Sequence, residues 1–331
     1  MRRAGGGAIA SKADRPAPFS FAGAEVKPGR AAEFEIPVAR LPAGTWVTMP
    51  TVVVHGRHKG PRVWLNAAIH GDELNGVEII RQVLAAVDAS RMCGTVIAVP
   101  IVNVFGVITG TRYLPDRRDL NRSFPGSRRG SLAARLAHLF FAEVVSRCEF
   151  GIDYHTGSAG RDNLPQIRCD ADDEVVRDLA CAFAPPIVVH ANVRDGSLRA
   201  AANADGKRVL LYEAGEALRF DERAIELGVA GTLRVLAALG MVPDGAGRPA
   251  QPPPVSRKTA WVRASRSGFC HLAVDRGHRV SAGDIVARIA DTHGRRTVPV
   301  RTKLGGVVIG CLRTAVVHRG EAVVHIAEVA A

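Results

Sequence analysis

Residues 66–76 read Asn66-Ala-Ala-Ile-His70-Gly-Asp-Glu73-Leu-Asn-Gly76. Residues 62–69, which overlap the start of this stretch, form an apolar run that is typical of a buried strand. The residues after it, 75–90, repeat apolar side chains at helical spacing. The stretch is therefore predicted to be a tight turn from a strand into a helix, with His70 and Glu73 in the turn.

A second segment, Gly151-Ile-Asp153-Tyr-His155-Thr-Gly157, also follows an apolar run and ends at a glycine. His70 and Glu73 can bind one ion from their turn, and His155 can supply a third ligand from a neighbouring strand. Two His and one Glu, with a fourth position open to water, form the ligand set of a catalytic zinc hydrolase. We therefore predict one Zn²⁺ per chain, although cobalt, manganese or iron also fit these ligands.

Strand-like and helix-like segments alternate over residues 21–241, which are predicted to form the catalytic domain. Such alternation predicts a three-layer α/β/α sandwich with a largely parallel central sheet. Residues 1–20 are rich in Gly, Ala and Pro and are predicted to be a disordered tail. Beyond residue 74, helices are expected at residues 75–90, 131–148, 172–184 and 221–239.

The character of the chain changes after a predicted linker at residues 242–254, which contains three consecutive prolines. Residues 255–331 have short alternating strands, regular Gly turns and no convincing helix, which indicates a small all-β domain. The length of 331 residues agrees with two domains, because one core rarely grows beyond about 250–300 residues.

The composition is that of an ordinary globular protein, with 47% hydrophobic and 23% charged residues. The start of the chain lacks the apolar core of a signal peptide, and no apolar run is long enough to cross a membrane. The six cysteines are scattered without a C-x-x-C pair, as is typical of reduced thiols. A cytoplasmic protein without a membrane partner is therefore expected.

The net charge of +12 bears on the choice of partner. The basic residues are spread along the whole chain, and aromatic residues are only 5%, which leaves few stacking platforms for nucleic acid. A small anionic substrate fits this charge better than a nucleic acid does. Self-association into a homo-oligomer is left open.

A polar loop at residues 109–126 carries candidate substrate-binding residues. Arg122 with Asn121 can hold a carboxylate, because the guanidinium binds both oxygens and the amide adds a donor. Arg112 is a candidate to polarise a scissile carbonyl and stabilise the oxyanion. Arg168, a short way after the second segment, is a candidate to bind the variable part of a substrate.

Three further carboxylates have predicted roles at the zinc site. Glu213 ends the apolar run 208–213, where a buried carboxylate is costly unless it has a partner or a function. Beside a zinc-bound water it can act as the general base and then return the proton to the leaving amine. Asp72 and Asp153 flank the ligands and are candidate acceptors for the imidazole N–H groups.

Together these residues resemble the succinylglutamate desuccinylase/aspartoacylase family, a branch of the zinc carboxypeptidase-like superfamily. The resemblance implies a zinc-carboxypeptidase-like catalytic domain, the same metal ligands, and the same roles for Glu213, Arg112 and the Asn121–Arg122 pair. Family members hydrolyse the amide bond of an N-acylated amino acid. The match runs in order through His70-Gly-Asp-Glu73, Arg112, Asp119-Leu-Asn121-Arg122, Asp153-Tyr-His155-Thr-Gly157 and Tyr212-Glu213-Ala-Gly215.

Residues 261–331 resemble the C-terminal β-domain of the same family, which is similar to lipoyl and biotinyl carrier domains. The likeness rests on Asp275-Arg-Gly277-His-Arg-Val280-Ser-Ala-Gly283-Asp284-Ile-Val286 and on Gly305-Gly-Val-Val308. The modified-lysine motif of a carrier is missing, because Lys303 is not flanked by Met. The domain is therefore predicted to be structural and not a carrier.

The leading hypothesis is zinc-dependent hydrolysis of a small N-acetyl or N-succinyl amino acid. The long loop from Arg112 to Asn121 resembles the broad bacterial deacylase branch, which includes enzymes that deacetylate N-acetyl-diaminobutyrate. A metallocarboxypeptidase acting on peptides is one alternative, because it uses the same residues in a more open groove. A non-catalytic binding protein that retained the pocket is another, against which the intact catalytic residues argue.

Overall fold

The computed structural model describes residues 16–243, 247 and 251–329. Residues 1–15 of the predicted tail and residues 244–246 and 248–250 of the predicted linker lie outside the described residues. The predicted tail includes the start of strand β1 (Phe19–Phe21), which pairs with β2 (Ala24–Val26). This hairpin is ordered because the ring of Phe21 is buried and packs edge-on against Phe34.

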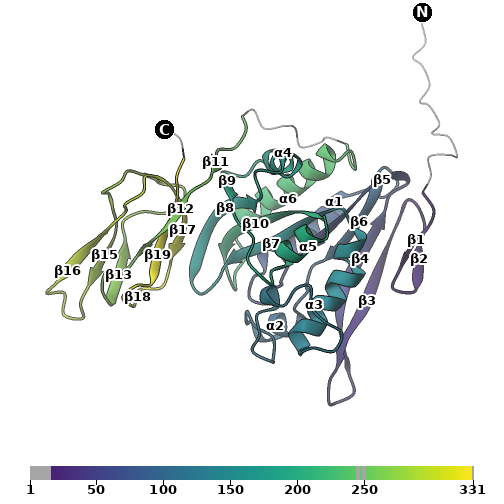
Figure 1. Cartoon of the computed structure of the whole chain (residues 1–331), viewed down its shortest axis with the longest axis horizontal. Coiled ribbons are helices and arrows are strands. Elements are labelled where there is room, and N and C mark those ends of the chain that lie inside the picture. The colour runs from purple at the N-terminus through teal and green to yellow at the C-terminus, as the bar shows by residue number, and fades with distance from the viewer. Residues whose placement is uncertain (1–15, 244–246, 248–250, 330–331) are drawn as a thin grey trace, which may run out of the picture.

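A single sheet of thirteen strands runs through the described chain (Figure 1). Its centre is parallel, as predicted, and consists in spatial order of β10 (Arg208–Glu216), β7 (Phe150–Gly157), β5 (His58–Asn66) and β6 (Cys93–Val99). Antiparallel strands extend it on both sides, namely β8 (Arg161–Cys169), β4 (Trp46–His55) and β3 (Arg30–Arg40). The short strand β9 (Val188–His190) pairs with β8.

Helices cover both faces of this sheet and bury two apolar cores, so the predicted three-layer architecture is confirmed. One core lies under α1 (Asn75–Ala86), α4 (Glu174–Phe183) and α6 (Glu222–Ala238). The other lies under α3 (Leu132–Glu143) and α5 (Leu198–Ala204). The described helices also include α2 (Val104–Thr109) and the 3-10 turns Leu120–Arg122 and Val145–Arg147. None of the described helices has the length and hydropathy needed to cross a bilayer.

The helix boundaries follow from capping side chains. Ser131 accepts a hydrogen bond from the Ala134 amide, and Asp221 accepts one from the Ala224 amide. The predicted helix 131–148 is shorter in the structure, because α3 ends at Glu143 and a 3-10 turn follows.

The C-terminal region contains no helix among its described residues, as predicted, and forms a β-sandwich. One layer is a four-stranded sheet of β16 (Thr297–Arg301), β15 (Ile285–Ala290), β13 (Gly268–Leu272) and β18 (Val316–Val317). The other layer belongs to the central sheet and contains β12 (Thr259–Arg263), β19 (Ala322–Ala327), β17 (Gly306–Leu312) and β14 (Arg279–Val280). Strand β17 pairs with β8, so the sheet is continuous from the catalytic region into the C-terminal region. The short strand β11 (Val255–Ser256) pairs with β9.

Candidate active site

The two predicted metal-binding segments meet at the carboxyl ends of neighbouring strands. His70, Glu73 and His155, called the metal triad below, are buried, and their ligand atoms lie within 4.8 Å of one another. Each imidazole turns Nδ1 toward the Glu73 carboxylate, at 2.9 Å from His70 and 2.8 Å from His155. Two imidazole nitrogens and one carboxylate oxygen that converge in this way fit the ligand preferences of Zn²⁺.

Glycines allow the turn that carries His70 and Glu73 to pack closely. A Cβ atom on Gly71 would lie 2.0 Å from the Gly106 backbone, and one on Gly76 would lie 2.4 Å from Tyr154 Cβ. Helix α1 can therefore start directly against the sheet. Strand β7 is the parallel neighbour of β5, which brings His155 beside this turn.

Each imidazole of the metal triad is backed by a second carboxylate. Asp119 Oδ1 lies 3.1 Å from His70 Nε2, and Asp153 Oδ2 lies 3.0 Å from His155 Nε2. Asp153 also accepts a 2.6 Å hydrogen bond from Asn66. Carboxylates in this position fix the orientation of a ligating ring. Asp72 was also predicted as an acceptor for an imidazole N–H group. Its Oδ1 is buried and has no hydrogen-bond partner among the described residues.

The metal triad is held together electrostatically. Burial alone would raise the pKa of Glu73, but the adjacent His70 and His155 hold it well below its usual value. Burial opposes protonation of His155, yet Asp153 and Glu73 raise its pKa well above the usual value. The cluster therefore favours positive charge between the carboxylates, a position that a divalent cation also satisfies.

Arg112 lies at the edge of the metal triad. Its Nη1 is 3.3 Å from Glu73 Oε1 and donates to Ser158 Oγ at 2.8 Å. Its Nε and Nη2 donate to Asp119 Oδ2 at 3.2 and 2.9 Å. Burial lowers the pKa of Arg112, but Glu73 and Asp119 raise it by more. The guanidinium is therefore a fixed positive charge beside the candidate metal position.

The eight residues predicted as metal ligands, catalytic residues or substrate-binding residues line one cavity of about 310 Å³. Asn121 accepts a hydrogen bond from the Leu198 amide through Oδ1, while Arg122 Nη1 donates to the Asn121 carbonyl. Arg168 Nη1 lies 3.8 Å from Glu213 Oε1. The eight residues are His70, Glu73, Arg112, Asn121, Arg122, His155, Arg168 and Glu213.

The cavity contains further residues that sequence reasoning missed. Arg199 lies in α5, a helix too short to be predicted from periodicity, and is 7% exposed. Trp261 and His325 come from the C-terminal region, and their rings stack at 4.2 Å. Burial, together with the charge of Arg168, lowers the pKa of His325 to about 3. Nothing in the local sequence around these residues indicates the cavity.

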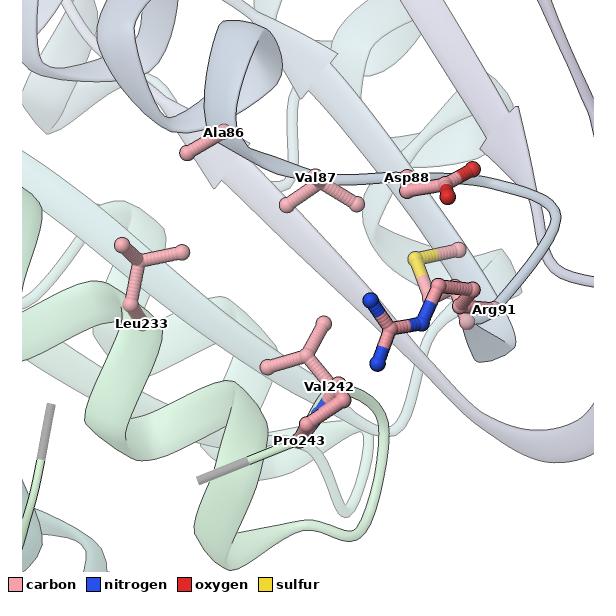
Figure 2. Close-up of a pocket in the computed structure, with 8 residues that line it drawn as sticks. Ala86, Val87, Asp88, Arg91, Leu233, Val242 and Pro243 are labelled. Atoms are coloured by element: carbon pink, nitrogen blue, oxygen red, sulfur yellow. The ribbon is translucent and has the colours of Figure 1, made fainter. Parts of the chain in front are cut away.

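A second cavity, of about 350 Å³, lies between the ends of α1 and α6 (Figure 2). Its lining is mostly apolar, and none of the predicted site residues contributes to it. Asp88 and Arg91 are its charged side chains, and they offer no group of converging metal ligands. We therefore place the chemistry in the first cavity. The second cavity is lined by Ala86, Val87, Asp88, Arg91, Met92, Leu233, Val242 and Pro243.

The chain combines a carboxypeptidase-like α/β domain, which has a candidate metal centre at the strand ends, with a C-terminal β-domain. The sequence-family model for the succinylglutamate desuccinylase/aspartoacylase catalytic domain matches residues 59–239. The chain therefore belongs to the succinylglutamate desuccinylase/aspartoacylase family, as its motifs predicted.

Individual relatives match most of the chain. The N-alpha-acetyl-L-2,4-diaminobutyric acid deacetylase of Halomonas elongata is 27% identical over 315 residues, which cover 89% of this chain and 90% of that protein. The crystal structure of a succinylglutamate desuccinylase/aspartoacylase from Rhodobacter sphaeroides has a TM-score of 0.80 and 26% identity, and the match covers 91% of this chain and 96% of that one.

A third relative shows the likeness of fold alone. The product-bound ectoine utilization protein EutE (DoeB) of Ruegeria pomeroyi has a TM-score of 0.82 at 24% identity. The match covers 90% of this chain and 95% of that one. The C-terminal β-region is thus part of the shared architecture.

Proposed function

We propose that this protein is a metal-dependent deacylase that hydrolyses the amide bond of a small N-acyl amino acid. The observation that carries the proposal is that the buried metal triad and Glu213 line one cavity with the Asn121–Arg122 pair. The deacetylase of Halomonas elongata, which matches nearly the whole chain, supports the same reaction type.

The residues of the cavity divide the work of amide hydrolysis. When bound, Zn²⁺ supplies a Lewis acid that lowers the pKa of water and polarises a carbonyl. Glu213 takes the proton of the attacking water and gives it to the leaving amine. Arg112 stabilises the negative charge that develops on the carbonyl oxygen. Asn121 and Arg122 hold the α-carboxylate of the amino acid.

A second anionic group of the substrate is assigned to Arg168 and Arg199. Among the described residues, no hydrogen-bond partner faces Arg199 Nη1 or Arg168 Nε, although both atoms are buried. Burial and the charge of Arg168 lower the pKa of Arg199. A buried arginine such as Arg199, beside the partly buried Arg168, is stabilised by an anion. An acidic side chain or a dicarboxylic acyl group such as succinyl supplies one, whereas diaminobutyrate carries an amine.

The aromatic pair from the C-terminal region supports a small substrate over a peptide. Trp261 and His325 form part of the cavity wall, where an extended peptide would need an open groove. The peptidase alternative is therefore the less favoured one.

The test is to purify the protein without added metal, measure its metal content, and assay amine release from a panel of N-acyl amino acids. The panel contains N-acetylaspartate, N-succinylglutamate, N-acetylalanine and N-acetyl-diaminobutyrate. We expect chelator-sensitive turnover, with preference for N-acetylaspartate and N-succinylglutamate, which carry at least one anionic group besides the α-carboxylate. Preference for N-acetyl-diaminobutyrate would overturn the role of Arg168 and Arg199, and absence of turnover with zinc restored would overturn the deacylase proposal.

A further inference from the structure

The carboxylate of Glu213 is oriented by a side chain that has no assigned role. Asn163 Nδ2 donates a hydrogen bond to Glu213 Oε2 at 2.6 Å. The other oxygen, Oε1, has the looser contact with Arg168, at 3.8 Å. Asn163 itself is only 9% exposed and lines the same cavity. One oxygen of Glu213 is thus fixed, and the other is left for chemistry.

Asn163 is fixed by two neighbouring strands. It lies on β8, where it is paired with Gly215 of β10 on one side and with Gly310 of β17 on the other. A Cβ atom on Gly310 would lie 2.9 Å from Asn163 Oδ1, so the absence of a side chain there makes room for the amide. The pairing of β8 with β10 is irregular between Glu213 and Gly215. This bulge lets Asn163 reach Glu213, although it is not directly opposite.

The C-terminal region also holds the backbone of Asn163. Arg276 Nη1 donates to the Asn163 carbonyl at 3.2 Å and to Asp162 Oδ1 at 2.7 Å. Its Nη2 lies 2.8 Å from Asp221, the N-cap of α6. Arg276 is therefore a clamp between the C-terminal region and the strand that carries Asn163.

We propose that Asn163 is a positioning residue for Glu213 and that the C-terminal β-region supports the reaction through it. The inference rests on the proposed role of Glu213 as the general base. A base must be held within hydrogen-bond reach of the water it activates, and displacement by about 1 Å can cost roughly 10²-fold in rate. Without the Asn163 amide, the Glu213 carboxylate is free to turn toward Arg168.

The first test is Asn163→Ala, with Gln166→Ala as the matched control. Gln166 is a buried amide on the same strand, but it donates to the Leu164 and Ile309 carbonyls instead of Glu213. We expect Asn163→Ala to lower kcat by roughly 10²-fold, with KM and zinc content close to wild type. A kcat loss no larger than that of the control would overturn the proposal.

The second test is Asn163→Asp, which places a carboxyl group against Glu213. The new group can donate a hydrogen bond only when one proton is shared by the pair. The ratio of its kcat to that of wild type should therefore rise as the pH falls, and a ratio that does not change with pH would contradict the proposal. A merely structural role of Asn163 predicts no such trend.

Crystal structures provide a readout that needs no substrate. Zinc-loaded wild type should show the Glu213 carboxylate in one position, and Asn163→Ala should show it displaced or in several positions. An unchanged carboxylate would overturn the inference. Glu213→Ala separates the two proposals: if it stays active, the base assignment itself fails, and if it is inactive while Asn163→Ala is not, only the positioning role fails.

Discussion

The orientation of the two imidazoles in the metal triad depends on the side chains that contact their outer nitrogens. Asp119 and Asp153 each lie within about 3 Å of the outer nitrogen of one imidazole. The Asn66 amide continues the Asp153 side of this chain and accepts a hydrogen bond from the indole of Trp64. The orientation of His155 therefore depends on residues of two strands.

Removal of one of these carboxylates should weaken metal binding. We expect Asp153→Asn to reduce Zn²⁺ affinity by roughly 10–100-fold, because it removes the acceptor that orients His155. Competition with a chromophoric chelator measures this loss. Asp72→Asn is the control, since among the described residues that carboxylate makes no hydrogen bond to an imidazole. Equal losses in both variants would contradict the assignment.

His325 makes stability depend on pH. Its pKa is about 3 when folded, because burial and the charge of Arg168 disfavour the imidazolium, against about 6.5 when unfolded. Between these values the unfolded chain binds more protons, so stability falls as the pH drops through that window. We expect His325→Phe, which retains a ring against Trp261, to gain about 2 kcal/mol relative to wild type at pH 5 compared with pH 8. Urea unfolding at both pH values measures it, and a constant difference would contradict the expectation.

Among the secondary-structure elements, the long helices could be predicted from their apolar periodicity, whereas the short helices could not. Helices α1, α3, α4 and α6 lie within their predicted ranges. Helices α2 and α5 were missed because they are too short to show a helical period. Strand β8 was missed because Arg161, Asp162 and Asn163 at its start break the apolar pattern, and Pro165 follows.

The candidate site also contains residues that could be predicted from sequence and residues that could not. The eight residues predicted as metal ligands, catalytic residues or substrate-binding residues lie on motifs that are local in the chain, and they line one cavity. Asn163, Arg199, Trp261 and His325 reach it through strand pairings and a short helix that join distant parts of the sequence. Such pairings leave no mark in the local sequence.

The start of α1 should tolerate no added side chain. In Gly76→Ala the new methyl group would lie 2.4 Å from Tyr154 Cβ and 2.6 Å from Ala67 Cβ. Helix α1 would move from the sheet and carry Glu73 with it, so we expect a loss of roughly 1–3 kcal/mol in stability together with weaker zinc binding. Gly305→Ala, where neighbours begin at 3.4 Å, is the control, and equal effects at both positions would contradict this account.

At the scale of the whole molecule, the sheet does not stop at the predicted domain boundary. Strand β17 hydrogen-bonds to β8, and buried Ile309 packs with Ile187 and Val189 across the junction. The sequence pattern indicated an α/β region followed by an all-β region. A continuous sheet across the two could not be predicted, because the pattern within each region does not show which strand edges meet. The exact boundaries of the predicted domains stay a prediction.

Two arginines at this junction allow its catalytic role to be tested. Arg276 and Arg313 both pair with Asp162 at 2.7 Å, but only Arg276 also reaches the Asn163 carbonyl. We expect both alanine variants to lose similar stability, and only Arg276→Ala to lower kcat, by about tenfold if the base moves by a fraction of an ångström. Thermal unfolding and steady-state kinetics separate these effects, and an equal fall in kcat for Arg313→Ala would contradict the clamp.

Zinc content and amine release of wild type and Glu213→Ala, measured on the same preparations, test the proposed metal-dependent hydrolysis most sharply. We expect about one zinc per chain in both proteins. Amine release should occur only in wild type and should be lost after chelation. Turnover that persists in Glu213→Ala, or a zinc-loaded wild type that releases no amine from any N-acyl amino acid tested, would contradict the proposed hydrolysis.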